Sequence, residues 1–168
     1  MEKTTLLCAE RETECRDGFS RLFDSWKTDF SVCDSFDAIS DETRLLIISE
    51  QFIFPQKYQI KHPVIISSDN TAGLHQLSTC EMPVYTCGFH EKDCLSYSSL
   101  LHESRTISLN RTIFSFSGVP IEPFEIPLYT DNLRNIDAFA LLAFVLTMLL
   151  NDILPENASK SFGKNYIT

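Results

Sequence analysis

The sequence predicts a three-layer α/β domain whose mostly parallel sheet is extended by an antiparallel meander. Two continuous apolar runs, at residues 45–48 and 64–66, are typical of parallel strands buried on both faces. Strands and helices alternate through the first half of the chain, which favours a parallel core. After Cys94 the helical period is lost, and strand-like segments follow one another as far as Leu128.

In the first half, residues 4–9 are expected to form a short buried strand and residues 10–26 an amphipathic helix. The apolar side chains of that helix recur with a helical period on one stripe: Cys15, Phe19, Leu22, Phe23 and Trp26. Trp26 ends the stripe and is expected to be mostly buried. Further strands are predicted at residues 30–36, 45–48, 64–66 and 83–86, with a short helix at 71–78.

In the second half, strand-like stretches lie near residues 94–100, 105–116 and 119–128. Ser117-Gly118 indicates a hairpin between the last two stretches, and three prolines place the last one at a sheet edge. We expect Asp131 to cap a helix that runs from Asn132 to about Ile153. This segment is apolar nearly all round, so it should lie between two layers.

Size and charge exclude several classes of function. A chain of 168 residues fits one domain, expected at 1–155 with a polar tail at 156–168. Its net charge of −9 disfavours nucleic acids and anionic membrane surfaces as partners. The longest apolar stretch, 138–150, is shorter than the roughly 20 residues that cross a bilayer. We therefore expect a cytoplasmic protein whose six cysteines are thiols.

Phosphate-binding loops need clustered glycines, because their backbone N–H groups must approach the phosphates. The chain has five glycines, and none of them are clustered. We expect no cofactor, no ATPase activity, and no Mg-ATP binding tighter than about 1 mM.

Cysteine and histidine residues leave a second interpretation open. Cys80, Cys87 and Cys94 recur every seven residues, and Cys87 and His90 are the closest Cys/His pair. Zinc sites usually bring ligands from pairs two to four residues apart, so Cys87 and His90 are only weak metal candidates and we expect no metal. A nucleophilic pair drawn from Cys87, His90, Cys94 and His102 would instead make a small cytoplasmic enzyme.

Three segments, together with the order of the elements, resemble the central domain of the Mur ligases, the amide-forming enzymes of peptidoglycan assembly. Residues 64–70 (VIISSDN) are similar to a strand and N-x-D-D turn of that family, and 84–89 (VYTCGF) to a later strand reading TYG. Residues 131–139 (DNLRNIDAF) resemble the helix start H-N-x-x-N-A-x-A-A. The resemblance covers residues 64–150, the C-terminal half of that domain.

In the family, the turn and the two asparagines lie near the ATP adenine. The resemblance therefore implies a ligand corner formed by Asp69, Asn70, Asn132 and Asn135. The chain departs from the family because it lacks the G-T-x-G-K-[ST] loop, the metal-binding Glu, the modified Lys and the amino-acid-binding domain, and because Asp131 replaces a His. The resemblance implies a non-catalytic domain that acts through a protein partner or senses a small ligand, linked to cell-wall metabolism.

Overall fold

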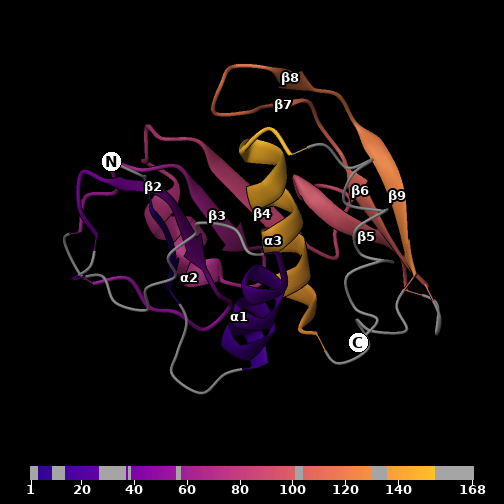
Figure 1. Cartoon of the computed structure of the whole chain (residues 1–168). Helices are drawn as coiled ribbons and strands as arrows, with labels where there is room; N and C mark the ends of the chain where they lie inside the picture. The colour runs from indigo at the N-terminus through magenta and orange to yellow at the C-terminus, as the bar shows by residue number, and fades with distance from the viewer. Residues whose placement is uncertain are drawn as a thin grey trace.

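One mixed sheet runs through the protein, and helices cover both of its faces (Figure 1). The computed structural model describes residues 4–8, 14–26, 37, 39–55, 58–100, 104–129 and 136–153. Within these ranges the sheet has seven strands, in the order β1-β2-β3-β4-β5-β6-β9. They are β1 (Thr4–Cys8), β2 (Thr43–Ile48), β3 (Val64–Ser67), β4 (Val84–Gly88), β5 (Leu95–Leu100), β6 (Ser104–Leu109) and β9 (Phe124–Tyr129).

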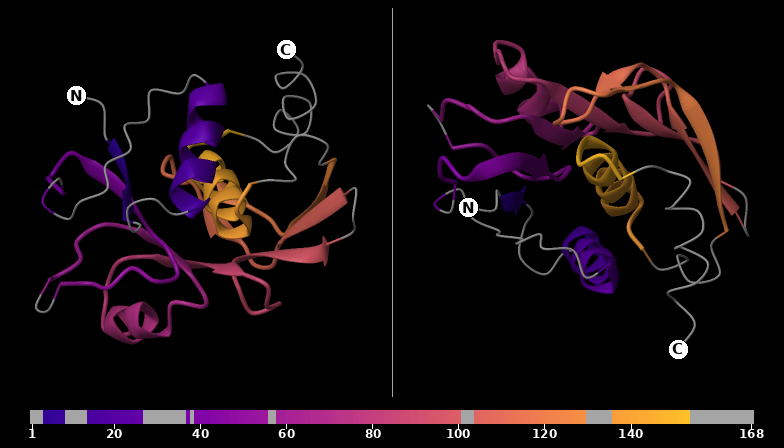
Figure 2. Two further views of the ribbon diagram at one scale, coloured as in Figure 1. Left: turned by 90° about the horizontal axis from the view of Figure 1, so that it is seen from below. Right: turned by 45° about the horizontal axis from the view of Figure 1, so that its top comes forward.

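The described helices are α1 (Glu14–Trp26), α2 (Thr71–Leu77) and α3 (Ala138–Leu150). Helices α1 and α3 lie on one face of the sheet and α2 lies on the other (Figure 2). Helix α3 packs between α1 and strands β3, β4 and β5, and nearly all of its side chains are buried. The predicted α/β class, the mostly parallel sheet and the enclosed apolar helix are confirmed. None of the described helices is long and apolar enough to cross a membrane.

Strand β2 shows how the apolar runs create two cores. Leu45 and Ile47 pack against α1 and α3, whereas Leu46 and Ile48 pack against the α2 side. All four side chains are fully buried. Because successive side chains of a strand point to opposite faces, a continuous apolar run is what a sheet covered on both faces requires.

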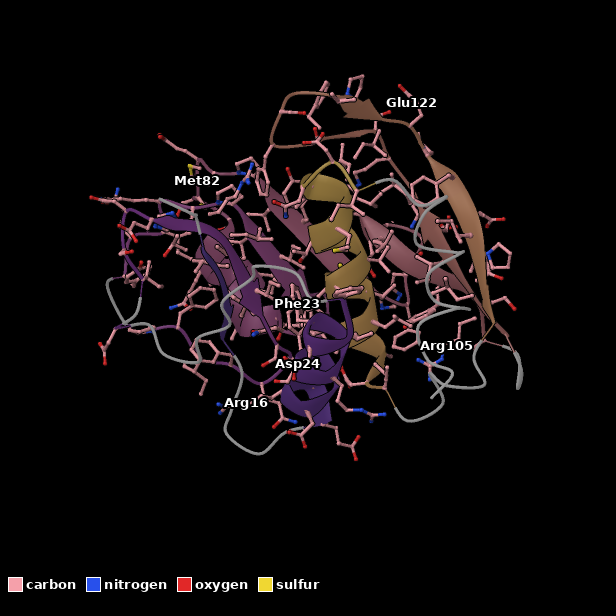
Figure 3. All side chains as sticks on the ribbon, in the orientation of Figure 1. Arg16, Phe23, Asp24, Met82, Arg105 and Glu122 are labelled. Atoms are coloured by element: carbon pink, nitrogen blue, oxygen red, sulfur yellow. The ribbon has the colours of Figure 1, made fainter. Side chains whose placement is uncertain are left out.

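Aromatic rings join α1 to α3. The Phe23 ring meets the Phe144 ring edge-on, with centroids 5.0 Å apart, and stacks on Phe19 at 4.5 Å. Phe23 lies at the end of α1 that faces α3 (Figure 3). Trp26 ends α1 as predicted, but its side chain is not among those described, so its expected burial stays a prediction.

Strands β4 and β5 are parallel neighbours although only residues 89–94 connect them, where a parallel crossover usually takes a dozen or more residues. The stagger of the two strands explains the short connection. Cys87 pairs with Leu95 and Gly88 with Ser96, so β5 starts beside the end of β4 and continues past it. Strands β5, β6 and β9 therefore extend beyond the carboxyl ends of β3 and β4.

The antiparallel part is more divided than predicted. The stretches 105–116 and 119–128 each form two strands, and the outer hairpin comprises β7 (Ile113–Phe114) and β8 (Pro120–Ile121). Asn110 ends β6 because its side chain bonds to Ser96 Oγ and to the Asp93 carbonyl. The expected turn is present, with Gly118 at φ +85°, and the proline-containing strand β9 lies at the sheet edge.

Helix α3 begins later than predicted. Ile136 and Asp137 are not helical, and the Asp137 side chain accepts a hydrogen bond of 2.8 Å from the Ala140 N–H as the N-cap. The prediction that Asp131 caps a helix starting at Asn132 is therefore wrong. The sequence could not show which residue is the N-cap, because Asp131 and Asp137 are both of a type that caps helices well. The strand predicted at 30–36 and the tail at 156–168 fall outside the described residues.

Candidate functional site at the carboxyl edge of the sheet

The carboxyl ends of parallel strands are where open α/β sheets usually bind ligands. Strands β2 and β3 end there at Ile48 and Ser67, and polar residues follow both of them. On the same edge, Ser49 and Glu50 contribute to a cavity with Asp137, the N-cap of α3. The polar turn after β2 thus meets the start of α3, which lies almost 90 residues later in the sequence.

Asn70, one of the predicted ligand residues, is fully used within the protein. Its side-chain oxygen accepts from the Gly73 N–H at 2.8 Å and caps α2, while its amide group donates to the carbonyls of Ser49 (2.8 Å) and Phe52 (2.9 Å). The residue is buried. With every polar position of its side chain occupied, Asn70 fastens the turn after β2 to α2.

The other three predicted ligand residues are placed only in part. Asp69 is exposed directly after β3, at the predicted edge. Asn132 and Asn135 lie outside the described residues, so their proximity to Asp69 stays a prediction. The correction to the start of α3 means that neither asparagine belongs to the first turn of that helix.

The wall that extends past β4 holds the start of α3 in place. The Tyr97 hydroxyl on β5 donates to the Ala138 carbonyl at 2.9 Å, and Arg105 on β6 donates to the Ile136 carbonyl at 3.3 Å. Burial raises the pKa of Tyr97, so its hydroxyl remains a donor throughout the neutral range. Arg105 lies on this wall, on the side of the lower end of α3 (Figure 3).

A cavity of about 160 Å³ opens at this edge, which we call the carboxyl-edge pocket. It lies between the turn after β2 and the first turns of α1 and α3. Its lining residues are Glu14, Cys15, Ser49, Glu50, Gln51, Asp137 and Phe139. None of these seven residues was predicted from the sequence to be a site residue.

Ser49 is the distinctive residue of this pocket. Its side chain is 5% exposed, and its hydroxyl oxygen has no hydrogen-bond partner among the described residues. Leu45 and Ile47 face α1 and α3, and the alternation of the strand carries Ser49 to that same side, toward the pocket. An unpaired buried hydroxyl is costly, and because Ser49 Oγ is itself closed off from the pocket, it is a cost that the fold carries beside the cavity.

A second polar network closes the loop after β4. Asp93 is buried, and its carboxylate accepts hydrogen bonds from Ser68 Oγ (3.1 Å) and the His90 N–H (3.0 Å). Gly88 makes this approach possible, because a Cβ there would lie 2.0 Å from Ser68 Oγ and 2.7 Å from Asp93 Oδ2. The network therefore joins the ends of β3 and β4 and is internally satisfied.

The cysteines proposed as nucleophiles are unsuited to that role in this conformation. Cys87 is fully buried, and burial raises its pKa well above the ordinary value. Burial likewise raises the pKa of Cys94 to about 11. Since the thiolate is the nucleophilic form, both are unreactive at neutral pH. His90 is exposed, whereas His102 is outside the described part of the chain.

A larger cavity of about 570 Å³ lies beside α2, away from the carboxyl-edge pocket. It is lined by a mixture of apolar and polar side chains, including Phe54, Tyr58, Leu77, Cys80 and Met82. In the described ranges, no three His, Cys, Asp or Glu side chains are grouped so that they could hold a metal ion.

The sequence did contain a signal for the carboxyl-edge pocket. Ser49, Glu50 and Gln51 are three polar residues directly after an apolar strand, the position at which ligand sites form in parallel sheets. The contributions of Asp137 and Phe139 required the correct start of α3. Comparison of the chain with models of known protein families and with curated protein sequences gives no match.

Proposed function

We propose that this chain is a non-catalytic, small-ligand-binding domain of Mur-ligase-like descent, with the carboxyl-edge pocket as its binding site. The observation that carries the proposal is the carboxyl-edge pocket itself, a cavity of about 160 Å³ beyond the end of β2 that is bounded by the first turns of α1 and α3. Open α/β sheets usually bind their ligands at this edge.

Three features support the proposed descent. Asp69 and Asn70 follow a buried parallel strand, as the family's turn does, and an antiparallel stretch follows the next strand. Helix α3 then begins at the same edge of the sheet. A domain of this kind without a phosphate loop would retain the ligand corner of the scaffold and use it for binding alone.

A direct test is a ¹⁵N NMR screen of the full chain against a library of small polar molecules of both charges. Binding at the carboxyl-edge pocket should produce saturable shifts clustered at the amides of residues 49–51 and 137–139. The same shifts should change in Glu50→Gln, which alters a carboxylate of the lining. Glu125→Gln, the same change on β9 outside the pocket, is the matched control and should retain them. Shifts confined to other regions would contradict the proposal.

The outer hairpin favours a second candidate, binding of a protein partner. Phe114 on β7 and Val119 before β8 are 59% and 52% exposed, and both belong to the short outer hairpin above α3 (Figure 1). Exposed apolar side chains on one hairpin can mark an interaction surface. Cross-linking in cells should then give a product that Phe114→Ser abolishes and Ser49→Ala retains.

A further inference from the structure

The larger cavity beside α2 lies at the opposite edge of the sheet from the carboxyl-edge pocket. Its lining comes from residues 54–55 and 58–61 in one segment and residues 76–77 and 79–82 in another. The first segment precedes β3 and the second precedes β4, and these two strands are parallel neighbours, so the cavity lies at their amino ends. We call this cavity of about 570 Å³ the amino-edge pocket.

The lining of the amino-edge pocket is held in place by the fold itself. Phe54 and Leu77 are 4% and 5% exposed and belong to the apolar core on the α2 side of the sheet. The Cys80 N–H donates to the Leu77 carbonyl at 2.9 Å, and the Cys80 thiol donates to the Ile60 carbonyl at 3.9 Å, which joins the two segments. A cavity whose lining is already fixed needs little ordering when a ligand binds, so less of the binding energy is lost.

The apolar part of the lining contains two aromatic rings and two sulfur atoms. They belong to Phe54, Tyr58, Cys80 and Met82. Tyr58, Cys80 and Met82 are half-buried, so part of each side chain stays open to the cavity. Aromatic rings pack favourably against other rings, and a thioether sulfur makes favourable contacts with ring edges. The lining therefore favours an aromatic ligand over a saturated one of the same size.

The size and the rim of the amino-edge pocket limit the ligand further. Cavities of roughly 300–1,000 Å³ take drug-sized molecules, and the amino-edge pocket falls within this range. Most of its exposed lining residues are polar, and they form the rim: Gln59, Lys61, Gln76, Thr79 and Glu81. A ligand that matches both parts has a flat apolar body inside the cavity and a polar group directed to the rim.

We propose that the amino-edge pocket is a second ligand site, which binds a small molecule made of fused aromatic rings with a polar group at one end. The ring system packs against Tyr58 and Met82, and the polar group faces the rim. This site is separate from the carboxyl-edge pocket and does not depend on the function proposed there.

The test compares an aromatic probe with its saturated analogue by ¹⁵N NMR titration of the full chain at pH 7. 2-Naphthol has two fused aromatic rings and a hydroxyl group, and decahydro-2-naphthol has the same skeleton without aromatic rings. We expect 2-naphthol to cause saturable shifts at the amides of residues 58–61 and 76–82, and to bind about fivefold more tightly than the saturated analogue. Equal or weaker binding of 2-naphthol would overturn the aromatic class, and shifts confined to other residues would overturn the site.

Two tryptophan substitutions on α2 connect binding to the cavity. Gln76 and His75 are both exposed on this helix, so an added ring is compatible with the fold, but only Gln76 lines the cavity. Gln76→Trp should fill part of the cavity and weaken 2-naphthol binding by about tenfold, whereas the matched control His75→Trp should change the affinity less than about twofold. Equal losses in the two variants would overturn the assignment of the site to this cavity.

Tyr58→Leu tests the ring contact without filling the cavity. Leucine keeps an apolar side chain at the lining and removes the aromatic ring. The variant should weaken 2-naphthol binding by about threefold or more and leave the affinity for decahydro-2-naphthol within about twofold. An equal loss for both probes would overturn the ring contact.

The outcomes distinguish this inference from the proposed function, because different amides report on the two sites. Saturable shifts of 2-naphthol at residues 49–51 and 137–139, with none at residues 58–61 and 76–82, would overturn this inference and leave the carboxyl-edge pocket as a binding site.

Discussion

Replacing Ser49 by Ala tests whether the hydroxyl buried beside the carboxyl-edge pocket is unpaired. The Ser49 hydroxyl is buried and has no hydrogen-bond partner among the described residues, so folding removes it from water without replacement. Alanine fills almost the same space and carries no polar atom. We therefore expect Ser49→Ala to raise the free energy of unfolding of the ligand-free protein, against the usual direction for a substitution in a protein interior.

The magnitude follows from the cost of an unpaired group. Leaving a buried hydroxyl without a partner costs about 1–3 kcal/mol. Removal of the oxygen also enlarges a cavity that is already present, which offsets a fraction of the gain. The net stabilisation expected is about 0.5–2 kcal/mol, measured as a higher midpoint in urea with an unchanged slope.

Ser96→Ala is the control for this measurement. Ser96 is also a buried serine, but its Oγ accepts a hydrogen bond of 2.8 Å from the Asn110 amide. Its loss leaves that donor unpaired and should destabilise the protein by about 1–3 kcal/mol. If Ser49→Ala destabilises the protein to a similar extent, the Ser49 hydroxyl is bonded in solution and this reasoning is refuted.

Four further predictions concern the polar contacts and thiols near this edge. Asn70→Ala should destabilise the protein by about 2–4 kcal/mol in urea unfolding, because it removes the N-cap of α2 and the two bonds that the amide donates to the Ser49 and Phe52 carbonyls; an effect below 1 kcal/mol would contradict the assigned role. Gly88→Ala should cost about 1–3 kcal/mol, since its Cβ overlaps Ser68 Oγ; unchanged stability would show that the loop relaxes freely. Cys87 and Cys94 should react with iodoacetamide at neutral pH only after denaturant is added, as followed by peptide mass spectrometry, and fast labelling would restore the Cys/His enzyme. Both thiols have a higher pKa in the folded protein than in the unfolded chain, so the unfolded chain loses these protons at a lower pH. The free energy of unfolding should therefore fall as the pH rises from about 9 to about 11.

Much of the fold could be predicted because single local rules decide it. The run at residues 45–48 must be a strand buried on both faces, and the alternation of Leu45 and Leu46 between two cores confirms this. Ser117-Gly118 forms the predicted turn because glycine readily adopts the positive φ found at Gly118. The edge position of β9 follows from Pro127, which cannot donate a ladder hydrogen bond.

The failures occurred where several residues compete for one role. Asp131 and Asp137 are equally good caps by type, and only packing selects Asp137. The start of α3 is held by side chains from strands that are remote in the sequence. Tyr97 donates a hydrogen bond to the Ala138 carbonyl, and Arg105 donates one to the Ile136 carbonyl. The site was missed for the same reason: the lining of the carboxyl-edge pocket comes from three segments that only the tertiary fold brings together.

The charges at the helix starts bear on which ligands this edge of the sheet can bind. In nucleotide-binding α/β domains, the exposed N–H groups and the dipole at a helix N-terminus attract phosphate. Here Asp137 occupies that position on α3, and Glu14 lies in the first turn of α1 beside the same pocket. The chain's own carboxylates thus occupy the helix starts at which a phosphate would otherwise bind, and they would repel a phosphate brought near.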